Sequence, residues 1–236
     1  MYLIAPIAMA IAPSIALLAY FHGKDRERPE PKRMVLIVFL AGVVSIVPAV
    51  FLELIVSRFG SPFFPSPLLA AAFEAFVVAG FCEEWMKRQA VKICIYGKKA
   101  FDERLDGIIY MITAGLGFAC MENVLYVIDG GIQAALIRAF TAIPLHAGAS
   151  GIMGYFIGIA RFAQDKREER ALFRRGLLWA VLIHGYYDFV LFIIPDAGLL
   201  PALSLVPLLV IVHVALARLI KKAKALDSGA GFRITE

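Results

Sequence analysis

Two short polar motifs interrupt otherwise apolar stretches of this sequence, and both carry residue types used in hydrolysis. Residues 83–87 read EEWMK and residues 184–188 read HGYYD. Residues three and four apart share a helix face, so Lys87 should lie between the two glutamates and His184 beside Asp188. A histidine paired with a carboxylate can bind one metal ion or be oriented by the acid. Two adjacent carboxylates in apolar surroundings need a nearby cation or a shared proton.

Two further polar positions lie in neighbouring apolar segments. The stretch 118–122 reads FACME and ends in Glu122, and His146 follows Pro144. Ionisable groups inside a bilayer are costly and are functional candidates by default. Any one of them alone has an ordinary structural explanation, such as an ion pair or a hydrogen-bonded packing histidine. Because four consecutive segments each contribute such groups, a wholly structural explanation is disfavoured.

The composition is typical of a chain that turns apolar side chains towards lipid. The protein has 236 residues, of which 61% are hydrophobic, and its mean hydropathy is +0.78. A soluble domain is about 45–50% apolar, and a helix needs roughly 20 residues to cross the hydrocarbon. We therefore expect an all-α, polytopic transmembrane bundle of about seven helices, forming a single integral membrane domain over 1–236. The expected segments are 3–21, 34–56, 68–95, 106–128, 134–160, 176–194 and 199–219.

The net charge of +5 is explained by membrane orientation and not by nucleic-acid binding. Every one of the 24 Lys and Arg residues except Arg58 and Arg138 falls on alternate connections, that is, on one side of the membrane. The positive-inside rule then predicts an outer N-terminus and a cytoplasmic C-terminus. No cleavable signal peptide is apparent, because strong positive charge follows the first segment and does not precede it. The three cysteines, Cys82, Cys94 and Cys120, are interpreted as reduced packing residues.

Depth along each segment places the candidate residues near one another. At about 1.5 Å per residue, Glu83, His146, His184 and Asp188 fall in the middle third of the membrane, with Glu122 nearer the outer face. Glu53 is interpreted as a structural residue near the outer end of its segment, and the role of Glu74 stays open.

Small residues in the fourth and fifth segments favour close helix packing. Gly154 and Gly158 form a GxxxG pattern, which lets two backbones approach. Pro144 is expected to loosen the fifth segment next to His146.

The three motifs, in this order, resemble those of the PrsW family of intramembrane proteases. That family is marked by EExxK, FxxxE and HxxxD on successive helices, which stand here at 83–87, 118–122 and 184–188. The resemblance spans about residues 80–190 and implies a membrane-embedded protease of a prokaryotic plasma membrane, with a membrane-anchored protein as substrate. One family role is site-1 cleavage of an anti-sigma factor. The family is grouped with metalloproteases, yet its CAAX-processing relatives are regarded as metal-free glutamate proteases.

Two mechanisms are consistent with these residues. With zinc, the ligands would be His146, His184, Asp188 and Glu122, and the metal-bound water would lose its proton to Glu83. Without metal, Glu83 and Glu122 would activate the water and His184 would support the oxyanion. In both, Glu84 pairs with Lys87. The catalytic candidates are thus Glu83, Glu84, Glu122 and His184.

Other functional classes remain open from the residues alone. Buried acids and histidines also form proton relays in transporters and channels, but no internal repeat of the kind common in transporters is detectable. A seven-helix receptor or retinal protein is the third possibility. The last segment, 199–219, contains no lysine for a retinal Schiff base.

Overall fold

The computed structural model describes residues 4–25 and 28–229, and all regular elements in them are helical. This confirms the predicted all-α class. Residue 3, where the first expected segment begins, lies outside the described residues. The elements are α1 (Ile4–His22), α2 (Lys32–Gly60), η1 (Ser61–Phe63), α3 (Pro67–Phe73), η2 (Glu74–Phe81), α4 (Cys82–Cys94), α5 (Arg104–Phe140), α6 (Ala142–Arg161), α7 (Lys166–Ala197), η3 (Leu200–Ser204) and α8 (Leu205–Asp227).

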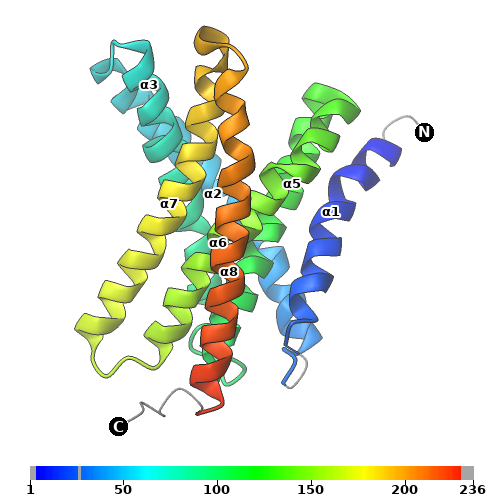
Figure 1. The fold of residues 1–236 in the computed structure, drawn as a ribbon, viewed down its shortest axis with the longest axis vertical. Coiled ribbons are helices and arrows are strands. Elements are labelled where there is room, and N and C mark those ends of the chain that lie inside the picture. The colour runs from blue at the N-terminus through cyan, green and yellow to red at the C-terminus, as the bar shows by residue number, and fades with distance from the viewer. Residues whose placement is uncertain (1–3, 26–27, 230–236) are drawn as a thin grey trace.

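Six helices in the described part of the chain are long and apolar enough to cross a membrane. They cover Ala5–His22, Lys32–Phe63, Arg104–Ile128, Ala142–Arg161, Lys166–Ala197 and Leu200–Asp227. The remaining expected segment, 68–95, is a continuous helical run through α3, η2 and α4. The described ends of α1 and α8 that lie nearest the two termini are at opposite ends of the bundle (Figure 1), as an odd number of crossings requires.

The third segment is not a regular α-helix throughout. Residues Glu74–Phe81 form the π-helix η2, which runs directly into α4 at Cys82. A π-helical turn is wider than an α-helical turn and is frequently found at functional sites. Here it ends immediately before the EEWMK motif, so it sets the direction in which that motif faces.

The boundary between the fourth and fifth segments differs from the expected one. Helix α5 continues to Phe140, and its backbone reverses at Gly131, where φ is +67°, a value that glycine adopts without strain. The chain then breaks again at Thr141 before α6 begins. Pro144 explains the second break, because it lies in the first turn of α6 and has no N–H to donate to Phe140. The expected segment 134–160 is therefore divided at Thr141.

Helices α5 and α6 form the centre of the bundle and lie unusually close together. A Cβ atom at Gly154 would lie 2.3 Å from the carbonyl oxygen of Gly107, and one at Gly158 would lie 2.0 Å from that of Arg104. The GxxxG pair of α6 thus packs directly on the backbone of α5. This contact fixes the register of the two helices that carry Glu122 and His146.

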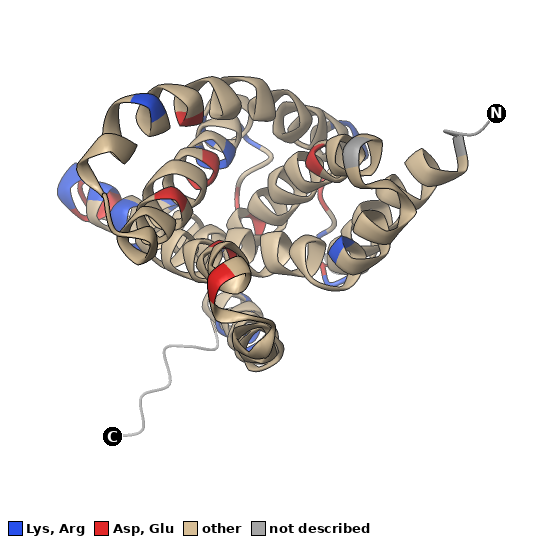
Figure 2. Cartoon of the chain, turned by 90° about the horizontal axis from the view of Figure 1, so that it is seen from above, with Lys and Arg blue, Asp and Glu red and all other residues tan. Residues whose placement is uncertain are grey.

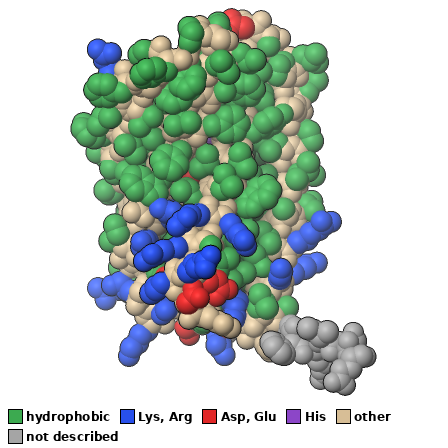
Figure 3. All heavy atoms as spheres, turned by 90° about the vertical axis from the view of Figure 1, so that its left-hand side faces the viewer, with side chains coloured by type: hydrophobic (Ala, Val, Ile, Leu, Met, Phe, Trp, Pro, Cys, Tyr) green, Lys and Arg blue, Asp and Glu red, His purple; other side chains and the backbone are tan. Residues whose placement is uncertain are grey.

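Charged side chains gather at one end of the molecule. On the face drawn in Figure 3, Lys and Arg crowd the lower part, while hydrophobic side chains cover most of the upper part. We call this the basic end; it holds residues 23–25, 28–31, 95–103 and 162–165 and the last turns of α8. Its assignment to the cytoplasm remains a prediction.

Candidate active site

The EEWMK motif forms a compact ion cluster on α4. Lys87 Nζ donates to Glu83 Oε2 at 3.0 Å and to Glu84 Oε1 at 2.8 Å. The side chains of Lys87 and Glu84 are fully buried, whereas that of Glu83 is 10% exposed. The i, i+3 and i, i+4 spacing thus produces the predicted pairing, with Lys87 between the two carboxylates.

The HGYYD motif of α7 faces this cluster. His184 Nδ1 lies 2.9 Å from Glu84 Oε1, and His184 Nε2 lies 3.2 Å from Asp188 Oδ2 and 3.8 Å from Glu83 Oε2. Gly185 makes the approach possible, since a Cβ atom there would lie 2.4 Å from the ring of Phe76 on η2. The wide π-helical turn and the glycine together place α7 against the glutamates.

His146 links α6 to α4 and to α5. Its Nδ1 lies 2.9 Å from Lys87 Nζ, and its Nε2 lies 2.9 Å from Glu122 Oε2 on α5. The same Glu122 oxygen binds the guanidinium of Arg138 at 2.8 Å. Both ring nitrogens of His146 are therefore engaged by charged side chains.

The structure brings all the sequence-predicted site residues into one hydrogen-bonded network. The imidazole rings of His146 and His184 lie edge to face with centroids 4.8 Å apart. Ligand atoms of Glu83, His146 and His184 lie within 4.8 Å of one another. Seen from above, acidic positions lie on helices within the bundle as well as at its rim (Figure 2). In this arrangement Glu122 and Asp188 each bind a nitrogen of one histidine and stand beside that three-residue group.

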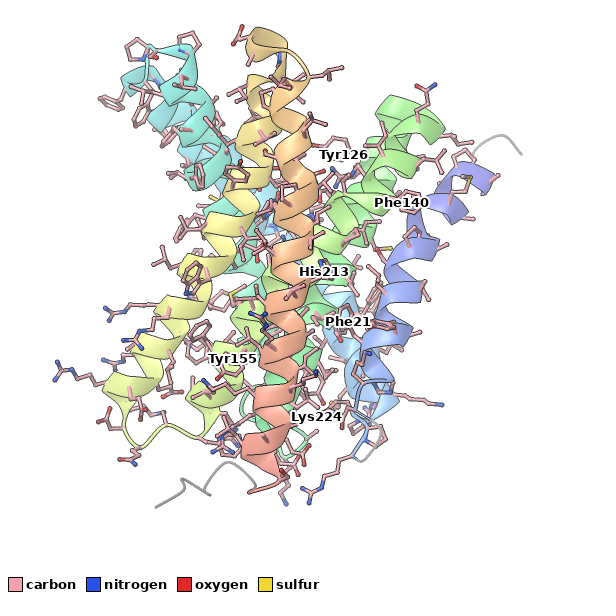
Figure 4. All side chains as sticks on the ribbon, in the orientation of Figure 1. Phe21, Tyr126, Phe140, Tyr155, His213 and Lys224 are labelled. Atoms are coloured by element: carbon pink, nitrogen blue, oxygen red, sulfur yellow. The ribbon has the colours of Figure 1, made fainter. Side chains whose placement is uncertain are left out.

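Arg138 is a further charged residue of the candidate site that was not predicted from the sequence. Its position in the chain predicts only that it is one of two basic residues on the outer side. In the structure its guanidinium binds Glu122, donates from Nε to Asn123 Oδ1 at 3.2 Å, and lies 4.0 Å from the ring centroid of Tyr126. Tyr126 lies on the upper part of α5, away from the basic end (Figure 4). The available signal was its place within an apolar segment, where an unpaired cation would be costly.

The structure also shows where two other intramembrane acids, Glu53 and Glu74, lie. Glu53 on α2 is half-buried and lies within electrostatic range of Glu83, Lys87 and Glu122, so it is nearer to the site than its expected structural role at the outer end of the segment implies. Glu74, at the start of η2, accepts hydrogen bonds from Ser57 and Ser61 at the end of the molecule opposite the basic end. Glu74 is thus a structural residue that ties η2 to the end of α2.

Comparison with known proteins agrees with the three motifs. The family model described as "PrsW family intramembrane metalloprotease" matches residues 30–217. Among curated proteins, the chain is 40% identical to Protease PrsW of Bacillus subtilis over 190 residues, which is 79% of this chain and 83% of that protein. It is 37% identical to Protease PrsW of Geobacillus kaustophilus over 78% of this chain and 79% of that protein. It is 30% identical to Protease PrsW of Shouchella clausii over 94% of this chain and 98% of that protein.

No solved structure matches the chain. The family match and the relatives cover most of its length, and the relatives are bacterial. With six apolar helices of membrane-spanning length, the molecule is a multi-pass integral membrane protein of a prokaryote. The chain therefore belongs to the PrsW family of intramembrane proteases.

Proposed function

We propose that this protein hydrolyses a peptide bond of a membrane-anchored protein, and that the cluster of Glu83, Glu84, His146 and His184 performs the reaction. The observation that carries the proposal is the convergence of these side chains, from three different helical segments, into one buried network. The family role that we carry over is site-1 cleavage of an anti-sigma factor. An anti-sigma factor anchored by one helix is thus the substrate class proposed here.

Glu83 is proposed as the general base. It differs from Glu84 in one respect that matters for catalysis: its carboxylate is partly accessible, whereas that of Glu84 is fully buried against Lys87 and His184. A base must reach the water whose proton it takes. Glu83 would accept this proton and later return it to the leaving amine.

The other charged side chains are proposed to orient the reacting groups. Glu84 and Asp188 hold the two nitrogens of His184, and Glu122 holds His146. Arg138 in turn fixes Glu122. These contacts fix the orientation of both rings, and the imidazoles are proposed to stabilise charge that develops on the carbonyl oxygen.

The donor set fits a zinc ion. Two histidines and a carboxylate are a common catalytic zinc set, and each histidine here also has a carboxylate on one ring nitrogen, as metal-bound histidines usually do. The four carboxylates of the network face only two fixed cations, Lys87 and Arg138. The ligands would be His146, His184 and Asp188, which leaves Glu83 free to act as the base. When bound, zinc would polarise the substrate carbonyl and activate the attacking water.

A metal-free version is supported by the position of Lys87. Its ammonium lies against Glu83, Glu84 and His146 Nδ1, so it already supplies a positive charge at the centre of the network. Glu83 and Glu122 would then activate the water directly, as in the second mechanism considered from the sequence. Metal analysis of the purified protein, with cleavage measured before and after chelator treatment, separates the two versions. Stoichiometric zinc with chelator-sensitive cleavage supports the first, and full activity without metal supports the second.

We infer that water reaches the site from the end opposite the basic end. The side chains of Glu122 and Asp188 are 16% and 15% exposed, whereas Lys87 and Glu84 are fully covered. Glu122 lies nine residues before the Gly131 reversal and Asp188 nine residues before the end of α7. A scissile bond in that half of the membrane would meet both water and Glu83.

Reconstituted proteolysis tests the proposed function. Purified protein in liposomes is supplied with single-span substrates that carry a fluorescent tag on each side of the membrane. We expect cleavage of a tethered substrate to one defined product pair. If no tethered substrate is cleaved while the same liposomes show protein-dependent proton flux, the protein is a transporter and the proposal is wrong.

A further inference from the structure

An apolar groove opens on the lipid-facing side of the bundle, apart from the catalytic network. It has a volume of about 680 Å³ and lies between α7 and α8, with α6 forming its floor. Its walls include Leu182 and Tyr186 from α7 and Leu208 and Ala215 from α8. The neighbouring His184 points the other way, into the buried cluster.

The groove has the length of one bilayer leaflet. Along α8 it extends from Leu208 to Leu219, which at 1.5 Å per residue is about 16 Å. Half of a hydrocarbon core roughly 30 Å thick is about 15 Å. Trp179 lies towards the basic end of the groove, a typical position for a tryptophan at the membrane interface.

The lining of the groove favours a lipid as its occupant. It is apolar along its length and includes one cation, Arg218, at the basic end. An acyl chain would pack on the apolar walls, and an anionic headgroup would pair with the cation.

One cation lines the basic end of the groove, and two more lie one helical turn from its lining residues. Arg218 belongs to its lining, Lys222 follows one turn later on the same face of α8, and Arg175 lies one turn before Trp179 on α7. In the described part of the chain, none of the three takes part in an ion pair within 4 Å. Lys222 Nζ lies 5.7 Å from the ring of Tyr155, which sits beside the lower half of α8 (Figure 4). No acidic residue lines the groove.

We propose that this groove binds one anionic phospholipid, with an acyl chain between α7 and α8 and the phosphate held by Arg218, Lys222 and Arg175. The apolar groove, which is as long as one leaflet, suits the acyl chain, and the cations at its basic end suit the phosphate. Basic pockets between transmembrane helices bind anionic headgroups in this way, and a guanidinium suits phosphate oxygens. The bound lipid fills the space between α7 and α8, which contact each other little along this face.

Tryptophan fluorescence can test this proposal, because the chain has only Trp85 and Trp179 and the second one lines the groove. The full-length Trp85→Phe protein is reconstituted in phosphatidylcholine vesicles with increasing amounts of a brominated quencher lipid. The quencher is either brominated phosphatidylcholine or brominated phosphatidylglycerol. We expect the anionic lipid to quench Trp179 at a mole fraction lower by roughly fivefold, about the effect of one cation near an anionic headgroup.

Matched variants distinguish a specific lipid-binding site from non-specific electrostatic attraction of anionic lipid. Arg218→Gln with Lys222→Gln should abolish the preference, whereas Arg174→Gln with Lys221→Gln, which removes equal charge at neighbouring positions, should retain it. Ala215→Phe, which fills the groove without changing charge, should also abolish it. Equal quenching by the two lipids in the Trp85→Phe protein would overturn the proposal. The proposal would also be wrong if the preference for the anionic lipid survived Ala215→Phe. It would be wrong as well if both double charge variants lost the preference equally.

Discussion

At the scale of single residues, ion pairs around the site offset the free-energy cost of burying its charged side chains. Arg138 and Glu122 form such a pair, with side chains only 11% and 16% exposed. Removing one partner of a buried pair typically costs about 3–5 kcal/mol, because the other charge is left uncompensated. Without Arg138, the buried carboxylate of Glu122 would lack its guanidinium partner. The network of charged side chains therefore includes Arg138 as well as Glu122.

Arg138→Gln should therefore lower the unfolding temperature in detergent strongly, and Arg138→Gln with Glu122→Gln should recover much of the loss. Thermal unfolding of the two single variants, the double variant and the wild type gives the coupling. Arg58→Gln is the control, because Arg58 is exposed near the same end and has no ion pair in the described structure. Additive effects of the two substitutions would show that the pair is not coupled.

Glu30, in the loop between α1 and α2, predicts a pH dependence of stability. Burial, together with Asp106 beside it, raises the pKa of its carboxyl from 4.5 to about 9, and Tyr110 donates a hydrogen bond to it. The folded protein thus holds this proton more tightly than the unfolded chain. The contribution of Glu30 to stability is complete below pH 4.5 and is lost as the pH rises towards 9.

Glu30→Gln should keep the shape and remove this titration. Between pH 5 and pH 9, we expect the unfolding temperature of the variant to fall less than that of the wild type. The difference between the two proteins should be largest near pH 9. Glu168→Gln, at an exposed position on α7, should leave the wild-type profile unchanged. Identical pH profiles for Glu30→Gln and the wild type would contradict the assigned pKa.

At the scale of helices, close backbone packing positions the side chains that are proposed to be catalytic. Gly154 on α6 faces the carbonyl of Gly107 so closely that an added methyl group would overlap it. Inserting a methyl group into such a contact costs about 1–3 kcal/mol. Any shift of α6 relative to α5 would also separate His146 from Glu122.

Gly154→Ala should accordingly lower both the unfolding temperature and the rate of proteolysis. Gly97→Ala is the matched control, since no atom lies within 4 Å of a Cβ at that position. Both variants add one methyl group to a glycine, but only at Gly154, inside α6, does that group meet the backbone of another helix. If both are equally stable and active, the α5–α6 contact does not determine the site geometry.

The sequence predicted the helices and most of the site because the relevant signals are local. Apolar runs of membrane-spanning length mark the segments, and i, i+3 and i, i+4 spacing gives the pairing of Lys87 with its glutamates and of His184 with Asp188. The π-helix η2 could not be predicted, because it depends on packing against α7 and not on local composition. Arg138 was missed for a similar reason: its partner Glu122 lies 16 residues away and becomes adjacent only through the reversal at Gly131.

At the scale of the whole molecule, the distribution of charge predicts the orientation in the membrane. The Lys and Arg side chains gather at the basic end, where α8 ends at Asp227 (Figure 3). We expect this end to face the cytoplasm, with the N-terminus outside. The route for water through Glu122 and Asp188 would then open towards the outside of the cell.

Cysteine accessibility in intact cells tests the orientation. In a protein whose three native cysteines have been replaced, single cysteines at positions 98–104 or 165–170 should resist a membrane-impermeant thiol reagent added outside. A cysteine at Arg58 should react. Labelling from outside at 98–104 or 165–170 would reverse the predicted topology.

The central claim is that Glu83 performs the chemistry while Glu84 and Lys87 hold the cluster together, and the most direct measurement compares Glu83→Gln with Glu84→Gln. Each purified variant is assayed for its single-turnover rate on a membrane-tethered substrate and for its unfolding temperature. Glu83→Gln should lose at least about 10²-fold in rate, the usual effect of losing a general base, with little change in stability. Glu84→Gln should lose stability together with activity, because its carboxylate is fully buried against Lys87 and His184. A Glu83→Gln protein that cleaves at the wild-type rate would contradict the account, and an inactive but fully stable Glu84→Gln protein would exchange the two roles.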